Sequence, residues 1–338
     1  MSGLSRAGLR MLCGMALALV VSGGGTAAAA PPTGWTSQPP LNVARVGAAY
    51  ATVGGRPMVV GGFSFTMGGL DSVEVRSAAG AWQFAAPMPT SRVNAVAAVL
   101  GGRVWVLGGY HNGAAAPIDV VEIYNPQTGS WSTGPALPVG RAQAGAAVLD
   151  GVLYVAGGYL AVGKKKEAVT ASVLAYDPRV GEWAPVSSLP SARGRVRLAA
   201  VGDHLYAIGG QNTDGDTVAL VDRYNPGTGT WQAVAPMVED RAVPGVTVLG
   251  SGRASRIAVI GGCQYTGYAL VQFRRTTEVY DPTTDQWRLL PAQLPTGRCS
   301  LSAAEYDGAL LAIGGGADTA PGGEPTVAVD ALRLPAAG

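Results

Sequence analysis

Six arginines recur along this chain at nearly constant intervals. They are Arg45, Arg92, Arg141, Arg193, Arg241 and Arg298. A guanidinium group presents fixed N–H donors that match the two oxygens of a carboxylate. If the repeats meet around one axis, these side chains gather on one surface. The arginines therefore predict a site for an anionic or polar ligand. The alternative is that each guanidinium holds the carbonyl groups of neighbouring loops.

Two further landmarks recur with each arginine. Glycine pairs begin at Gly61, Gly108, Gly157, Gly209, Gly261 and Gly314, sixteen residues after the arginine in five copies and twenty in the other. Tryptophans precede the arginines by ten residues in five copies and by eleven in the last, at Trp35, Trp82, Trp131, Trp183, Trp231 and Trp287. This regularity predicts a structural repeat of about fifty residues.

Each repeat has the composition of short strands separated by turns. In the second copy, strands are expected over 95–100, 104–107 and 120–124, with a fourth beginning at Trp131. The segment from Asn125 to Gly129, Asn-Pro-Gln-Thr-Gly, supplies the turn between the third and fourth strands. Glycine permits close backbone approach and positive φ, and tryptophan buries a large area between sheets. An all-β fold of four-stranded units follows.

The arginine, the double glycine, the Tyr-Asp/Asn-Pro turn and the tryptophan together resemble the kelch repeat. This resemblance covers nearly all of the chain beyond its first thirty residues. It implies a six-bladed β-propeller of four-stranded antiparallel blades around a central channel. The expected blades span approximately 46–91, 92–140, 141–192, 193–240, 241–297, and 298–338 together with 30–45.

The last blade is expected to be completed by the N-terminal segment. Trp35 and Arg45 have no glycine pair before them, whereas Gly314 and the strand over 327–334 have no tryptophan after them. Each incomplete copy supplies what the other lacks. The segment near Trp35 is therefore predicted to form the outer strand of the last blade, paired with residues around 329–332.

The candidate ligand residues lie at one end of the predicted blades. We call this end the loop face: it consists of the segments that follow the glycine pairs and the segments around the six arginines. The loops vary in length between repeats, whereas the arginine segments hardly vary, which is typical of adaptable loops on a rigid scaffold. Besides the arginines, the candidates in these loops are His111, Asn112, Tyr265 and Tyr268.

No catalytic constellation is recognisable, and no cofactor or metal is expected. The resemblance includes enzymes, notably galactose oxidases and sialic acid mutarotases. The oxidases need copper held by two histidines, but His111 and His204 are expected on opposite faces. A mutarotase needs only acid–base groups, and its residues cannot be matched to this chain. The segment 212–216 contains two aspartates but lacks the remaining ligands of a calcium loop.

The first residues have the pattern of an export signal. Arg6 and Arg10 precede an apolar run over 11–21 and a small-residue segment that ends in alanines, so cleavage is expected after Ala29. The remaining chain has no segment long enough to span a membrane as an apolar helix. We expect a secreted or periplasmic protein. Cleavage leaves two cysteines, Cys263 and Cys299, predicted either to form a disulfide or to remain buried thiols.

The charge balance excludes one class of partner. Charged residues make up 14% of the chain and the formal net charge is +2, too little positive charge for a nucleic-acid-binding surface. The favoured function is a binding or interaction module that recognises a protein, a peptide or another polar or anionic ligand on the loop face. The alternatives are a carbohydrate-binding protein and a sugar-active enzyme of the mutarotase kind.

Overall fold

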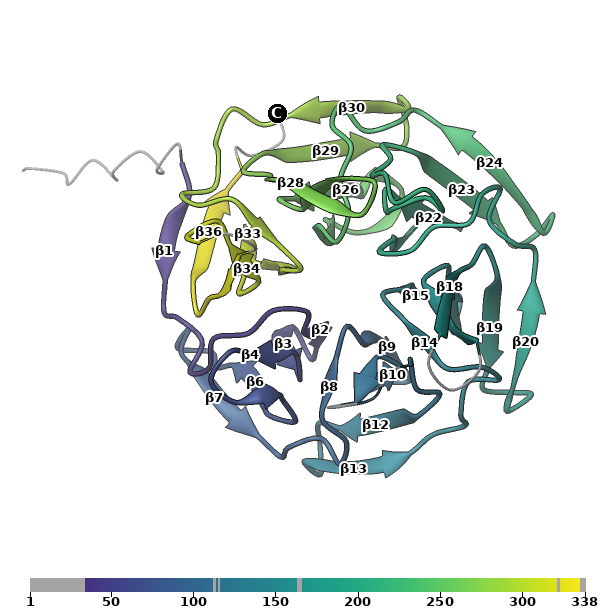
Figure 1. Cartoon of the computed structure of the whole chain (residues 1–338), viewed down its shortest axis with the longest axis horizontal. Coiled ribbons are helices and arrows are strands. Elements are labelled where there is room, and N and C mark those ends of the chain that lie inside the picture. Colours follow the sequence, from purple (N-terminus) through teal and green to yellow (C-terminus); the bar gives the residue numbers. More distant parts are fainter. Residues whose placement is uncertain (1–33, 112–113, 115, 163–165, 321–322, 335–338) are drawn as a thin grey trace, which may run out of the picture. The chain divides into compact units, whose positions relative to one another are not determined.

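The computed structural model describes residues 34–111, 114, 116–162, 166–320 and 323–334. In this part of the chain the regular structure is almost entirely β-strand, with six four-stranded antiparallel sheets (Figure 1). The first three, from inner to outer strand, are β2(Ala49–Val53), β3(Arg56–Val60), β6(Val73–Arg76), β7(Trp82–Ala85); β9(Val96–Leu100), β10(Arg103–Leu107), β12(Val121–Asn125), β13(Ser130–Thr133); and β15(Gly145–Leu149), β16(Val152–Ala156), β19(Val173–Asp177), β20(Glu182–Val186). The last three are β21(Arg197–Val201), β22(His204–Ile208), β23(Val221–Asn225), β24(Thr230–Val234); β25(Gly245–Leu249), β26(Arg256–Ile260), β29(Thr277–Asp281), β30(Gln286–Leu289); and β32(Ser302–Tyr306), β33(Ala309–Ile313), β36(Val329–Arg333), β1(Thr36–Gln38). The all-β, four-stranded architecture predicted from the sequence is confirmed.

The inner strands of the sheets form a closed circuit within the unit from residue 32 to residue 338. Each inner strand contacts the inner strand of the next sheet, from β2 through β9, β15, β21 and β25 to β32, and β32 contacts β2 again. Figure 1 views this circuit end on, with the inner strands around the centre and the fourth strands on the outside. The sheets are therefore arranged as the blades of a propeller.

The N-terminal strand closes the last sheet. β1 pairs antiparallel with β36, with Thr36 opposite Ala331 and Gln38 opposite Val329. Trp35, just before β1, packs against the apolar cluster that contains Leu310 and Leu332. In Figure 1 the purple β1 lies beside the yellow β36, so strands from the two ends of the sequence share one sheet. The predicted closure is confirmed, and β1 covers the edge of β36 that would otherwise be unpaired.

The glycine pairs join neighbouring sheets through the main chain of the repeat arginines. The second glycine of each pair donates its N–H to the carbonyl of the next repeat arginine along the circuit. The six bonds, 2.7–3.0 Å long, are Gly62 to Arg92, Gly109 to Arg141, Gly158 to Arg193, Gly210 to Arg241, Gly262 to Arg298, and Gly315 to Arg45. The first glycine lies against the same carbonyl, and at Gly108 an added Cβ would come within 2.0 Å of the Arg141 oxygen. The glycines are thus required by close contact between sheets.

Four of the six repeat tryptophans join neighbouring sheets at their outer strands through a hydrogen bond. Trp131 stacks on Tyr124 of its own sheet at 5.1 Å between ring centroids, and its indole N–H donates to the carbonyl of Ala86 in the preceding sheet at 2.9 Å. The same arrangement recurs for Trp183, Trp231 and Trp287. The sequence therefore indicated the packing role of these residues correctly.

The segments that follow the glycine pairs form small additional sheets on the loop face. They are β4(Phe63–Ser64) with β5(Gly68–Gly69); β8(Arg92–Val93) with β11(Tyr110–His111); β14(Arg141–Ala142) with β17(Tyr159–Val162) and β18(Lys166–Val169); β27(Cys263–Thr266) with β28(Ala269–Phe273); and β31(Arg298–Cys299) with β34(Gly316–Ala317) and β35(Glu324–Pro325). One short 3-10 helix, η1(Gly252–Ala254), precedes β26. No helix among the described residues is both long and apolar enough to cross a membrane.

The contact at Gly108 predicts a large effect of a single methyl group. Gly108→Ala should lower the free energy of unfolding by about 3–5 kcal/mol, because the methyl group displaces the Arg141 carbonyl in addition to straining a left-handed backbone. Gly101→Ala is the matched control, since Gly101 has φ 59° against 60° at Gly108 but has open space around its Cβ position. Its loss should be about 1–2 kcal/mol. Equal losses in chemical denaturation would contradict the contact between sheets.

Candidate functional site

The structure places the six repeat arginines inside the sheets. Their exposed fractions lie between 0% and 3%, so none reaches a ligand at the channel mouth. Each Nη1 donates to the carbonyl of the first glycine sixteen or twenty residues later, at 2.7–3.4 Å. The structure therefore does not place Arg45, Arg92, Arg141, Arg193, Arg241 and Arg298 where they would bind a ligand at the mouth, as the sequence predicted. The alternative, that they hold loop carbonyls, describes the structure, because a buried guanidinium requires many hydrogen-bond acceptors.

Five of these arginines also have a buried carboxylate partner on the third strand of their own sheet. The pairs are Arg45 with Glu74, Arg92 with Glu122, Arg193 with Asp222, Arg241 with Glu278, and Arg298 with Asp330. Burial lowers the pKa of each of these arginines, and its carboxylate opposes that shift. The charges of the five pairs are thus neutralised within the scaffold.

The third sheet departs from this pattern. Leu174 occupies the position of the carboxylate, and Arg141 donates instead to the hydroxyl of Ser172 at 2.7 Å and to the carbonyl of Gly157. Burial lowers the pKa of Arg141 to about 10, with no carboxylate to oppose the shift. The guanidinium still carries its charge at neutral pH and remains bound to main-chain oxygens.

A second circle of hydrogen bonds surrounds the mouth of the channel on the loop face. It is formed by the residues two positions after each repeat arginine, which all have φ between 46° and 63° and each donate N–H to the carbonyl of the preceding member at 2.8–3.2 Å. The circle consists of Gly47, Asn94, Gln143, Arg195, Val243 and Ser300. Together with Val46, Phe63, Val93 and Tyr265, these residues line a hollow of about 210 Å³. The shared backbone geometry points different side chains toward one opening.

Arg195 is the one charged side chain lining this hollow among the described residues. Its guanidinium carbon lies 4.3 Å from the centroid of the Tyr265 ring, and Nε donates to the Gln143 side-chain oxygen at 3.1 Å. Its Nη1 is buried without a hydrogen-bond partner. Stacking on a tyrosine holds a guanidinium in place while leaving N–H groups available in its plane.

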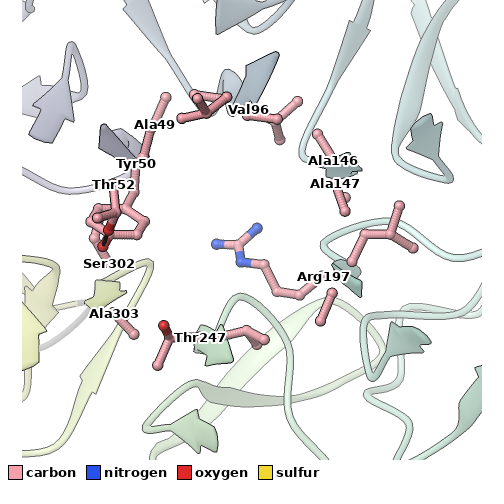
Figure 2. Close-up of a pocket in the computed structure, with 18 of the residues that line it drawn as sticks. Ala49, Tyr50, Thr52, Val96, Ala146, Ala147, Arg197, Thr247, Ser302 and Ala303 are labelled. Carbon is pink, nitrogen blue, oxygen red and sulfur yellow. Dashed lines mark hydrogen bonds between the residues drawn. The ribbon is translucent and has the colours of Figure 1, made fainter. Parts of the chain in front are cut away.

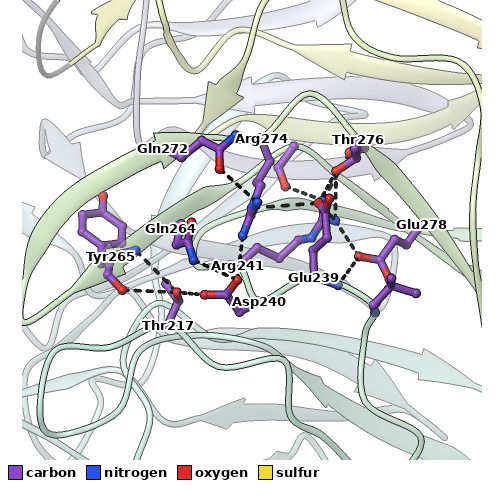
Figure 3. A network of polar contacts seen from close by, with 12 residues as sticks. Thr217, Glu239, Asp240, Arg241, Gln264, Tyr265, Gln272, Arg274, Thr276 and Glu278 are labelled. Atoms are coloured by element: carbon purple, nitrogen blue, oxygen red, sulfur yellow. Dashed lines mark hydrogen bonds and ion pairs between the residues drawn. The ribbon is translucent and has the colours of Figure 1, made fainter.

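A polar network behind the hollow holds Tyr265 (Figure 3). Asp240 accepts from Arg274 at 2.6 Å and from Gln264 at 3.3 Å, and it also accepts from the Thr217 hydroxyl. The main-chain N–H of Tyr265 donates to that hydroxyl oxygen at 3.4 Å. The network joins the fourth and fifth sheets and fixes the strand that carries Tyr265.

The central channel continues beyond the mouth. Its cavity has a volume of about 350 Å³ and is lined by the inner strands of all six sheets, mainly with alanine and valine. Figure 2 shows the Arg197 side chain extending from β21 into the middle of this cavity. Arg197 is the one charged residue among the described residues that line it.

The other predicted ligand residues are not brought together. His111 is exposed at the end of β11, with Nδ1 3.0 Å from the carbonyl oxygen of Ser91, and Asn112 lies outside the described residues. Tyr265 lines the mouth, whereas Tyr268 donates its hydroxyl to the carbonyl of Thr213 at 2.8 Å and is not among the lining residues. No group of three or more His, Cys, Asp or Glu suited to a metal occurs in the described ranges.

A disulfide lies directly behind the mouth. Cys263 and Cys299 are bonded, with their Cα atoms 5.3 Å apart, and both are buried. Tyr265 is two residues after Cys263, and Ser300 follows Cys299, so two lining residues are attached to this link. The bond fastens the fifth sheet to the sixth.

Sequence reasoning missed Arg195 and Arg197. Arg197 stands out when the repeats are aligned position by position. The residues four positions after the repeat arginines are Ala49, Val96, Gly145, Arg197, Gly245 and Ser302. A large cation stands where the other copies have small or apolar residues. These two arginines are therefore visible in the sequence as departures from the repeat and not among the residues that the repeats share.

Comparison with known proteins agrees with this architecture. The Kelch motif model matches residues 91–138, 140–190, 192–238 and 256–292, more than half of the chain. The chain belongs to the kelch-motif family, whose fold is confirmed here as a β-propeller. A solved structure titled "Structure of YjhT" has a TM-score of 0.73 at 18% identity, covering 88% of this chain and 97% of that chain, which shows the shared fold.

Curated relatives match over a smaller part of their length. Kelch-like protein 36 of Mus musculus is 30% identical over 137 residues, covering 39% of this chain and 21% of the relative. Kelch-like protein 40 of Xenopus laevis is 30% identical over 152 residues, covering 45% of this chain and 23% of the relative. The matched part therefore spans less than a quarter of these relatives.

The buried ion pairs give a test of their structural role. Asp330→Asn should lower the free energy of unfolding by about 3–5 kcal/mol, because it leaves the Arg298 guanidinium buried without its carboxylate. Asp307→Asn is the control: its pair with Arg333 has a similar separation of 3.0 Å but lies at the surface, so the change should be within about 1 kcal/mol. Comparable losses in urea titrations would contradict the scaffold role.

Proposed function

We propose that this chain is a secreted or periplasmic binding module that recognises an anionic segment of a partner protein at the channel mouth. The observation that carries the proposal is Arg195, the one charged side chain among the described residues that line the hollow, held there against the ring of Tyr265. A carboxylate in the hollow would pair with this guanidinium through charge-assisted hydrogen bonds.

The surroundings of Arg195 favour an anion over a cation. The residues that line the hollow include no Asp or Glu, while Asn94, Gln143 and Ser300 add side-chain amide and hydroxyl groups. The scaffold arginines already have their own acceptors, so Arg195 supplies the local positive charge. Geometry at the mouth, and not the small net charge of the chain, provides the attraction.

The character of the loop face favours a protein ligand. Phe65, Met67, Tyr268 and Val271 follow glycine pairs and have exposed fractions from 54% to 65%. Exposed apolar and aromatic side chains on the loop face are available for contacts with a partner protein. Kelch domains commonly bind proteins, which agrees with this reading.

An acidic carbohydrate is the second candidate ligand. The amides of Asn94 and Gln143 and the hydroxyl of Ser300 are suited to sugar hydroxyl groups, and Arg195 is suited to a sugar carboxylate. This alternative includes a sugar-active enzyme of the mutarotase kind.

Export is supported by sequence and by cysteine chemistry. The predicted signal segment lies outside the described residues, but a disulfide between Cys263 and Cys299 suits an oxidising compartment. The proposed partner is therefore met outside the cytoplasm.

A fluorescent peptide of alternating Glu and Gly tests the main proposal by anisotropy. Arg195→Ala should weaken binding about 10- to 100-fold, since it removes a hydrogen-bonded charge, and wild-type affinity should fall as salt rises. Arg103→Ala, at an exposed position at the start of β10, should leave the affinity unchanged.

The alternatives have distinct outcomes in the same assay. A peptide in which Gln replaces Glu should bind poorly if the anion matters. Equal affinity of wild type and Arg195→Ala for the Glu peptide would overturn the proposal. Binding of glucuronic acid without binding of the peptide would favour the carbohydrate reading.

A further inference from the structure

The channel interior contains a charge that the scaffold does not use. Arg197 enters a cavity whose lining is otherwise uncharged, and its Nε donates to the carbonyl of Pro244 at 2.9 Å. Within the described part of the chain, its terminal nitrogens have no hydrogen bond or ion pair. This differs from all six repeat arginines, whose terminal nitrogens are bound to carbonyl, hydroxyl or carboxylate oxygens.

The charge of Arg197 persists despite its surroundings. Burial lowers its pKa to about 10, so the guanidinium is protonated at neutral pH. A charge that is partly removed from water without a counter-ion is unfavourable, and the cost falls when an anion joins it. An apolar wall also strengthens the attraction between the cation and an anion in the same cavity.

The fold does not require an arginine at this position. Arg197 lies four residues after a repeat arginine and begins its inner strand. The residues in the same position of the other five sheets are Ala49, Val96, Gly145, Gly245 and Ser302. Five sheets therefore form with a small or apolar residue there. The packing of the repeat therefore does not explain why the fourth sheet has an arginine at position 197.

Hydroxyl groups line the cavity around this guanidinium. Figure 2 shows Arg197 pointing into the open centre, with Tyr50, Thr52 and Ser302 on the wall across from its strand and Thr247 beside it. The Tyr50 and Thr52 hydroxyls are hydrogen-bonded to each other. Guanidinium N–H groups and hydroxyls together suit the several acceptor positions of a small oxyanion.

We infer that the channel contains a binding site for a small monovalent oxyanion of the carboxylate class, held by the terminal nitrogens of Arg197. The single positive charge matches a single negative charge, and the planar fork matches two carboxylate oxygens. This site lies inside the channel and does not depend on Arg195 at the mouth. Acetate has the required carboxylate and is small enough for the cavity of about 350 Å³.

Acetate binding can be measured by saturation-transfer NMR on its methyl group, with the purified chain in a chloride-free zwitterionic buffer. The wild type should give a saturable signal, and Arg197→Val should bind at least about tenfold more weakly. Arg197→Val introduces the residue found at position 96, so a cooperative melt should show that it remains folded. Arg197→Lys should bind with intermediate affinity, because it keeps the charge but loses the fork.

Two further variants separate this site from other cations. Arg195→Ala should retain acetate binding even if it loses the peptide at the mouth, and Arg103→Ala should behave as wild type. Equal acetate binding by Arg197→Val, or no saturable signal from the wild type up to about 10 mM acetate, would overturn the inference. Displacement of acetate by chloride at equal concentration would show recognition of charge alone and contradict the carboxylate assignment.

Discussion

Each repeat arginine connects its own sheet and the sheet before it through different atoms. Its guanidinium binds the glycine carbonyl at the end of the second strand and, in five sheets, a carboxylate on the third. Its main-chain carbonyl accepts the N–H of the preceding sheet's second glycine. Because a buried guanidinium carries a charge and several donors that need acceptors, its environment is tightly specified. The circuit of sheets depends on this residue.

That arrangement leaves the channel free to vary. The repeat arginines are fixed inside the sheets. The residues two and four positions later face the mouth and the cavity, and they take no part in the ion pairs within the sheets. In five sheets these positions carry uncharged residues, whereas the fourth sheet carries Arg195 and Arg197. A symmetric scaffold thus presents an asymmetric pair of cations, and the arginines that hold the sheets together differ from those proposed to bind ligand.

The sequence predicted the architecture well because its causes are local and repeated. Glycine pairs, tryptophans and turn residues report the contacts that make each sheet, and the unmatched copies at the two ends predicted that β1 completes the sheet of β36. The candidate site was predicted poorly. The sequence does not distinguish an arginine buried against a carboxylate such as Glu74 from one that faces a cavity. Which of the two occurs depends on partners about thirty residues away. Tyr265 was predicted as a candidate because it lies in a loop. Its contact with Arg195 could not be predicted, because it joins the fifth sheet to the fourth.

Native-state hydrogen exchange at six glycine amides tests the central claim most directly. The amides of Gly62, Gly109, Gly158, Gly210, Gly262 and Gly315 donate to the arginine carbonyls that join successive sheets. If the circuit is one cooperative unit, all six should exchange with the same free energy of opening, equal to the free energy of global unfolding. Opening free energies that differ by about 2 kcal/mol or more among the six amides would show that the sheets open separately and would contradict the account.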